Sequence, residues 1–152
     1  MKITVINEQD ALIICSKQVE QIVEHVLKYE NCQCDEVIIH FVNDQTICQL
    51  HLQYFDDDSL TDCITFPIDE EEDSYYRLLG EVLICPYTAI LYAEKNQKDP
   101  YLETTLYLIH GLLHLLGYDD IENIERKKMR QAEKRNMKNL AKLGLELKPN
   151  PP

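Results

Sequence analysis

The chain lacks three features that would assign it to common classes of protein. No stretch of about 18 consecutive apolar residues occurs, and the longest candidate, residues 106–116, is interrupted by two histidines, so we expect no membrane span. The segment MKITVINEQD has neither the apolar core nor the small-residue cleavage site of an export signal, which predicts a cytoplasmic protein. The six cysteines include no CxxC pair, which argues against a zinc ribbon or a thioredoxin-like motif.

The length and composition are those of one globular domain. A chain of 152 residues can bury roughly two thirds of its unfolded surface. Hydrophobic residues make up 45% and charged residues 28% of the chain, which are ordinary values for a soluble protein. No internal repeat is evident. We therefore predict a single domain over residues 1–147 and a flexible tail over residues 148–152.

The charge is distributed unevenly along the chain. The formal net charge is −12, but from Ile121 onward nine Lys and Arg accompany four Glu, a net charge of +5. The first 120 residues hold the other six basic and 23 acidic residues, a net charge of −17. A block of one charge sign usually forms a solvated face. The basic block nevertheless follows directly on the two histidines, where an anionic ligand would need it.

Strand and helix patterns alternate along the sequence. Alternating or continuous runs of apolar residues predict strands at 2–6, 36–42, 62–67 and 81–85. Helical spacing of apolar residues predicts helices at 16–30, 44–52, 88–95, 100–116 and 121–143, and the acidic segment 69–76 reads as a loop. These elements predict an α+β fold in which a mixed four-stranded sheet packs with about five helices.

Three residues are candidate N-caps, and one glycine is a candidate helix stop. Ser16 and Asp44 can cap the first two helices. Asp99 precedes Pro100, which suits the first helical position. Gly117 can adopt the left-handed conformation that commonly ends a helix.

The segment HGLLHLLGYDD, residues 110–120, holds the candidate metal ligands. His110 and His114 are four residues apart on the expected helix, so both imidazoles project from one face about one turn apart. After the stop at Gly117, Asp120 adds a carboxylate. Two imidazoles and one carboxylate with an open fourth position are typical of catalytic zinc. The pattern predicts one Zn²⁺ bound by His110, His114 and Asp120, on a buried helix and the turn after it, although other divalent transition metals tolerate this ligand set.

Two other interpretations of the histidine pair remain open. A histidine on an apolar helix is more often a hydrogen-bonded core residue than a ligand, although each buried imidazole left without a partner would cost about 1–3 kcal/mol. The spacing also occurs in zinc peptidases, where a glutamate after the first histidine acts as the general base. That position is Gly111 here, so a peptidase would lack its base.

Beyond this motif, the sequence resembles the YbeY family of metal-dependent endoribonucleases and ribosomal RNA maturation factors. Residues 110–120 match the family signature HGxLHLxGYDH at every fixed position except the last. LHLQYFDDDSLTDCITFP, residues 50–67, is similar to LNxxYRxxDxPTDVLSFP, and LGEVLICPYTA, residues 79–89, is similar to LGDIxIxxxTA. Glu103, Met129 and Glu133 also stand where the family has them.

The resemblance implies a metal-dependent endoribonuclease, specific for single strands, that acts in ribosomal RNA maturation. Its reaction would be hydrolysis of a phosphodiester by a metal-activated water. Its partners would be RNA, the small ribosomal subunit and assembly factors. Glu103 is a candidate base, although an ion pair or a hydrogen bond to a ligand is the commoner use of such a residue. Thr61 and Asp62 either cap a turn or line the cleft, and Arg77 is a candidate phosphate contact.

Two residues depart from the family pattern. The family's third ligand is histidine, and Asp120 in its place lowers the charge of a zinc centre by one unit. Asp119, by analogy with the family, is expected to support a ligand or to shape the turn rather than to bind the metal. The arginine that the resemblance assigns to phosphate is Phe55, which cannot pair with a phosphate. An alternative function is therefore a ribosome-associated maturation factor with weak or absent catalysis, and the acidic total predicts weak intrinsic RNA binding.

Overall fold

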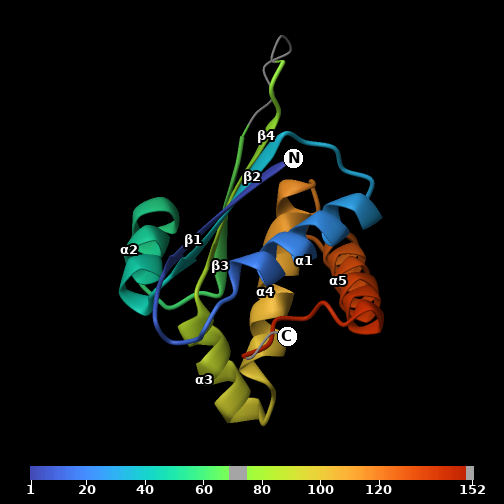
Figure 1. Ribbon diagram of the computed structural model, residues 1–152. Helices are drawn as coiled ribbons and strands as arrows, with labels where there is room; N and C mark the ends of the chain where they lie inside the picture. Colours follow the sequence, from blue (N-terminus) through green and yellow to red (C-terminus); the bar gives the residue numbers. More distant parts are fainter. Residues whose placement is uncertain (69–74, 150–152) are drawn as a thin grey trace.

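Four strands and five helices make up the part of the chain that the computed structural model describes, residues 1–68 and 75–149 (Figure 1). The strands are β1 (Lys2–Glu8), β2 (Glu36–Val42), β3 (Cys63–Pro67) and β4 (Leu78–Ile84). The helices are α1 (Ser16–Tyr29), α2 (Asp44–Phe55), α3 (Pro86–Asn96), α4 (Pro100–Leu115) and α5 (Asn123–Leu143). The predicted α+β class is confirmed.

The sheet is mixed, as the sequence predicts. Its strand order is β1-β2-β4-β3, with β1, β2 and β4 parallel and β3 antiparallel to β4. Strand β3 lies at an edge because β4, its one partner among the described strands, pairs with β2 on its other side. Most of the expected loop at 69–76, which joins them, lies outside the described residues.

Two hydrophobic clusters lie against the sheet. The larger one joins the buried sides of α1, α4 and α5 to β2 and β4, with Ile22, Phe41, Leu112 and Met129 among its fully buried side chains. The smaller one joins Ile47 of α2 to residues of β2, β3 and β4 that alternate with those of the first cluster. Because successive strand residues point to opposite faces, α2 covers one face of the sheet, and α1, α4 and α5 cover the opposite face (Figure 1).

Two of the predicted helix caps are displaced by one residue. The α1 N-cap is Cys15, without a side-chain cap bond, and Ser16 is the first helical residue. Asn43, in extended conformation directly after β2, caps α2 by accepting a hydrogen bond from the Thr46 N–H at 2.9 Å, so Asp44 also falls inside its helix. The predicted cap at Asp99 is confirmed, since its carboxylate accepts from the Tyr101 N–H at 2.8 Å.

Helix α4 is buried on most of its circumference. Nine of its sixteen residues are buried, and its turn after Leu115 passes through Gly117 at a φ of 98°, which confirms the predicted stop. Within the described residues no helix, α4 included, is long and apolar enough to cross a membrane. Burial against the sheet accounts for its apolar sequence instead.

Gly111 lets α4 lie close to the sheet. A Cβ atom at this position would lie 2.4 Å from Val82 Cγ1 and 3.5 Å from Thr65 Cγ2. Val82 is fully buried in β4 and cannot swing into solvent. The helix therefore reaches this distance from β4 only with glycine at 111, and this contact sets the height of the flanking histidines above the sheet.

The described end of the chain packs against α4. Leu147 is 2% exposed, and its N–H donates to Thr105 Oγ1 at 3.2 Å. The Lys148 N–H donates to Gln18 Oε1 at 3.2 Å. Of the predicted flexible tail, residues 150–152 lie outside the described residues.

We predict that Gly111→Ala destabilises the fold through the contact with Val82. Overpacking of this kind costs about 1–3 kcal/mol, against roughly 1 kcal/mol that alanine gains from helix propensity. Urea unfolding should therefore show a net loss of about 1–2 kcal/mol. The matched test is a double-mutant cycle with Val82→Ala, which removes both clashing methyl groups. The double variant should lose less stability than the sum of the single variants, and additive losses would show that this contact is not the cause.

Candidate functional site

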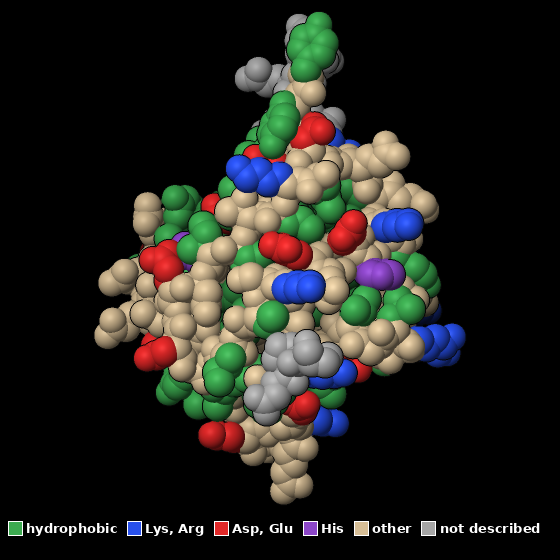
Figure 2. Space-filling model, viewed as in Figure 1, with side chains coloured by type: hydrophobic (Ala, Val, Ile, Leu, Met, Phe, Trp, Pro, Cys, Tyr) green, Lys and Arg blue, Asp and Glu red, His purple; other side chains and the backbone are tan. Residues whose placement is uncertain are grey.

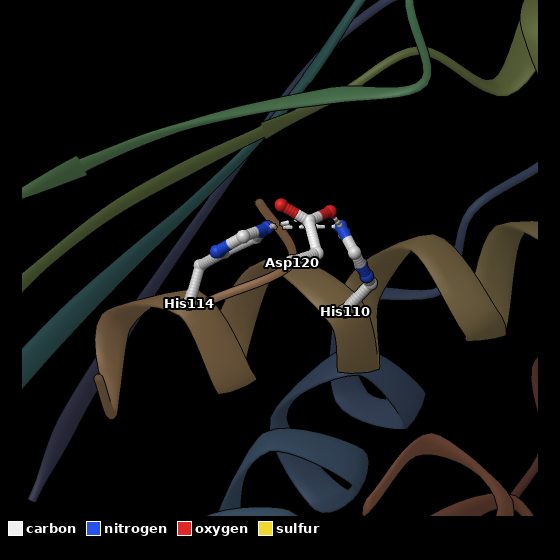
Figure 3. A group of neighbouring side chains, drawn as sticks. All are labelled: His110, His114 and Asp120. Carbon is white, nitrogen blue, oxygen red and sulfur yellow. Dashed lines mark hydrogen bonds and ion pairs between the residues drawn. The ribbon is translucent and has the colours of Figure 1, made fainter. Parts of the chain in front are cut away.

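His110, His114 and Asp120 converge at the C-terminal end of α4 (Figure 3). The two Nε2 atoms are 3.0 Å apart, and Asp120 Oδ2 lies 3.7 Å from each of them. The side chains are 13%, 24% and 35% exposed in that order, so the group is sheltered but open to solvent on the aspartate side. The three residues that the spacing predicts as ligands are thus brought together.

The three atoms fit one metal ion. The point equidistant from the corners of their triangle lies about 2 Å from each corner, which is the usual zinc–nitrogen and zinc–oxygen distance. Three protein ligands with solvent on one side leave a position for water or substrate, as in catalytic zinc sites. This donor set suits a divalent transition metal and does not by itself select zinc.

The polar partners of the two Nδ1 atoms, which lie on the far side of each ring from the site, favour metal binding through Nε2. His114 Nδ1 lies 3.0 Å from the Tyr118 carbonyl oxygen, which can only accept, so Nδ1 carries the proton. His110 Nδ1 faces the Glu133 carboxylate at 3.6 Å. With the Nδ1 protons placed in this way, the Nε2 atoms of neutral rings present lone pairs to each other and to Asp120. Two unprotonated Nε2 atoms 3.0 Å apart repel each other, and a cation shared between them would remove this repulsion.

Glu133 of α5 is the buried partner of this site. It is 4% exposed and forms an ion pair with Arg130, whose Nη1 lies 2.6 Å from Oε2. Burial alone would raise the pKa of Glu133, but the hydrogen bond with His110 and the guanidinium of Arg130 outweigh burial and lower it. The carboxylate is therefore ionised and can hold the His110 imidazole with Nε2 directed at the site. Glu133 lies 23 residues after His110, and no local spacing pattern relates the two residues. In the sequence, only the family resemblance indicates Glu133.

The turn that carries Asp120 is fixed from two sides. Asp119 Oδ1 accepts from the Asp120 N–H at 2.7 Å, so Asp119 shapes the turn as expected. From α5, the Arg126 guanidinium donates to the carbonyl oxygens of Asp120 and Ile121 at 3.2 and 3.1 Å. These bonds place Asp120, the third candidate ligand, over the helix end.

Glu103 lies on α4, outside the group formed by His110, His114 and Asp120, which we call the ligand group. Burial raises the pKa of Glu103, Lys98 lowers it and the charge of Asp62 raises it, with a net upward shift. Seven residues separate it from His110, which is about 10 Å along the helix axis. Its role as a base therefore stays a prediction.

The other predicted site residues have local partners. Asp62 Oδ1 accepts from the Cys63 N–H at 2.7 Å at the start of β3, and the Thr61 carbonyl accepts from Thr88 Oγ1 at 2.8 Å. The Thr61 contact reaches across to α3, and the Asp62 contact stays within the chain at the start of β3, so both suggested roles, capping a turn and lining the cleft, stay predictions.

Arg77 lies in a different pocket from the ligand group. Its Nη1 donates to the Gln33 carbonyl. It lines a pocket of about 630 Å³ beside the outer side of the 117–119 turn. Phe55, at the end of α2, is 58% exposed with its ring 5.7 Å from His51.

Comparison with known proteins gives one family. Residues 4–141 match the family described as endoribonuclease YbeY. The chain belongs to the YbeY family. The resemblance seen in the sequence is thereby confirmed.

Its relatives within the family match most of the chain. Proteins named endoribonuclease YbeY from Protochlamydia amoebophila and Chlamydia pneumoniae are 53% and 42% identical to it, covering 93% and 88% of this chain and 95% and 87% of theirs. The solution structure of TM1509 from Thermotoga maritima superposes with a TM-score of 0.64 at 29% identity, covering 91% of this chain and 88% of that one. The YbeY family assignment therefore rests on the sequence matches, and the fold is shared with a solved structure.

We predict that Glu133→Gln weakens metal binding at this YbeY site. The amide keeps the shape of the side chain but loses the charge that holds the His110 imidazole, and such outer partners typically contribute 10–100-fold to affinity. Competition with a chromogenic chelator should show Zn²⁺ affinity falling at least about tenfold. Glu125→Gln, with the same charge change on the same helix, is the control. Equal Zn²⁺ affinities for the two variants would refute the role given to Glu133.

Proposed function

We propose that this protein is a metal-dependent endoribonuclease that hydrolyses phosphodiester bonds in single-stranded RNA during ribosomal RNA maturation. The observation that carries the proposal is the convergence of His110 Nε2, His114 Nε2 and Asp120 Oδ2 on one point in a chain of the YbeY family. The relatives' name, endoribonuclease YbeY, supports RNA as the substrate.

The residues of such a site have two roles: some hold the metal ion, and others orient the side chains that hold it. When bound, a divalent ion supplies Lewis-acid chemistry, acidifying water and polarising a phosphoryl oxygen. His110, His114 and Asp120 hold it, with zinc as the proposed ion. Glu133 and the Tyr118 carbonyl keep both imidazoles in the tautomer that leaves Nε2 free. Glu103, whose pKa burial raises, is the candidate to accept a proton at the substrate.

The packing of α4 argues against the peptidase alternative. A zinc peptidase of this spacing needs a glutamate at position 111 as general base. Here even a Cβ atom would lie 2.4 Å from Val82. The position cannot hold a side chain without moving the helix, so hydrolysis of peptides is disfavoured by space as well as by sequence.

The charge of the chain bears on its partners. With a formal net charge of −12, the protein as a whole repels RNA, and affinity for nucleic acid depends mainly on phosphate neutralisation. We therefore propose that the substrate is met on the small ribosomal subunit or with its assembly factors, in the cytoplasm.

We predict that His114→Ala and chelation both abolish RNA cleavage. Loss of a ligand should cost more than the roughly 10–100-fold typical of an outer partner, so cleavage of an unstructured oligoribonucleotide should fall by more than about 100-fold. Added Zn²⁺ should restore the chelated wild type but not the variant. His25→Ala, on α1 and outside the ligand group, is the matched control and should keep full activity.

Other outcomes of this experiment point to the alternatives. Bound metal with no RNA cleavage under any condition would support a maturation factor without catalysis. Hydrolysis of peptides alone would support a peptidase. A sharp fall in melting temperature on chelation would show that the ion also contributes to folding.

A further inference from the structure

Helix α5 carries five basic residues at a spacing of four. They are Arg126, Arg130, Lys134, Lys138 and Lys142, which we call the α5 basic stripe, and all five are exposed. At 1.5 Å per residue, successive members are displaced by about 6 Å along the axis, so the stripe is about 24 Å long. Basic side chains are visible in Figure 2 along the right-hand edge, where α5 lies in Figure 1.

The opposite side of α5 is fixed against the rest of the protein. Met129, Ala132, Asn136 and Leu140 are buried, and the Asn136 side chain donates to Glu30 Oε1 at 3.1 Å. The helix therefore cannot turn the stripe inward, and the charges face solvent in every folded molecule.

The stripe begins at the metal site. Arg126 donates to the Asp120 carbonyl, and Arg130 forms the ion pair with Glu133, which faces His110. The other three members, which are lysines, lead away from the site along the helix. No ion pair joins any of these three lysines to a described residue. A polyanion held along the stripe would thus have one end beside the three ligand atoms.

Arg126 and Arg130 also have structural contacts, but stability does not explain the three lysines of the stripe. Opposite charges four residues apart stabilise a helix, whereas like charges at this spacing destabilise it. Four consecutive like-charge pairs occur on α5, in a chain whose first 120 residues carry a net charge of −17. Phe55, which stands where the resemblance places a phosphate-binding arginine, brings no charge. The cations that a phosphate chain requires are therefore concentrated on α5.

We propose that the α5 basic stripe binds the phosphate backbone of the RNA strand whose scissile bond lies at His110, His114 and Asp120. The proposal rests on the function proposed above. A phosphodiester strand carries one negative charge per nucleotide and matches a periodic row of cations better than a folded acidic protein does. The contacts are to phosphates, so they position the strand without reading its sequence.

The test compares two triple variants with the same change of charge. Lys134→Gln, Lys138→Gln and Lys142→Gln together shorten the stripe but leave the two arginines that touch the site. Lys17→Gln, Lys28→Gln and Lys95→Gln together remove three exposed lysines of α1 and α3. Binding of a fluorescein-labelled unstructured oligoribonucleotide is measured by anisotropy at several salt concentrations, with chelator present to prevent cleavage.

The stripe variant should bind RNA more weakly than the control variant. Each lost phosphate contact on a single strand lowers the slope of log affinity against log salt by about 0.7, so three contacts change it by about 2 and weaken binding roughly 100-fold at 0.1 M salt. Unchanged binding, or equal losses in the two triple variants, would overturn the proposal. If poly-glutamate of the same total charge competes as well as unlabelled RNA does, the stripe binds any polyanion, and the assignment of RNA as its ligand is wrong. Melting temperatures and Zn²⁺ affinity should be the same as in the wild type.

Cleavage measurements separate this proposal from the function on which it rests. If the stripe positions substrate, the stripe variant should show a raised KM and an unchanged kcat. If the wild type shows no chelator-sensitive cleavage, the proposed function fails, while the anisotropy comparison still decides whether the stripe binds RNA. If the wild type cleaves and both triple variants have its KM, the stripe proposal fails alone.

Discussion

The contact between Gly111 and Val82 determines where α4 lies on the sheet. With no side chain at 111, the helix axis comes close enough for its backbone to pack on β4 and β3. His110 and His114 flank this contact at the edge of the core, so their side chains are largely buried, while that of Asp120 beside them is more exposed. Gly111 therefore has two consequences: it leaves no side chain where a zinc peptidase has its general base, and it lets α4 pack closely on the sheet.

Polar partners then fix the chemistry of the two rings. The Tyr118 carbonyl oxygen faces His114 Nδ1, and the Glu133 carboxylate faces His110 Nδ1. Hydrogen bonds of Asp119 and Arg126 fix the turn that carries Asp120. Asp120 replaces the histidine expected from the family signature, and its oxygen still lies equally far from both nitrogens. The departure changes the charge of the site more than its geometry.

Sequence patterns predicted the parts that depend on local spacing. The helix start at Pro100 and the stop at Gly117 follow from residue type, and the convergence of the candidate ligands follows from their spacing of four and six residues. The caps at Ser16 and Asp44 were each misplaced by one residue, because capping depends on which residue has extended backbone. Strand β4 begins at Leu78 rather than 81, since Gly80 pairs with Pro67 across the hairpin. Glu133 reaches His110 through the packing of α5 on α4, which no local spacing encodes.

The site proposed here depends on one cation shared by His110, His114 and Asp120. A crystal structure of the zinc-loaded protein, with anomalous data collected on both sides of the zinc absorption edge, tests it most directly. We predict an anomalous peak about 2.0–2.1 Å from both Nε2 atoms and from a carboxylate oxygen of Asp120. A peak bound by other residues, or full zinc loading with the two imidazoles turned apart, would contradict it.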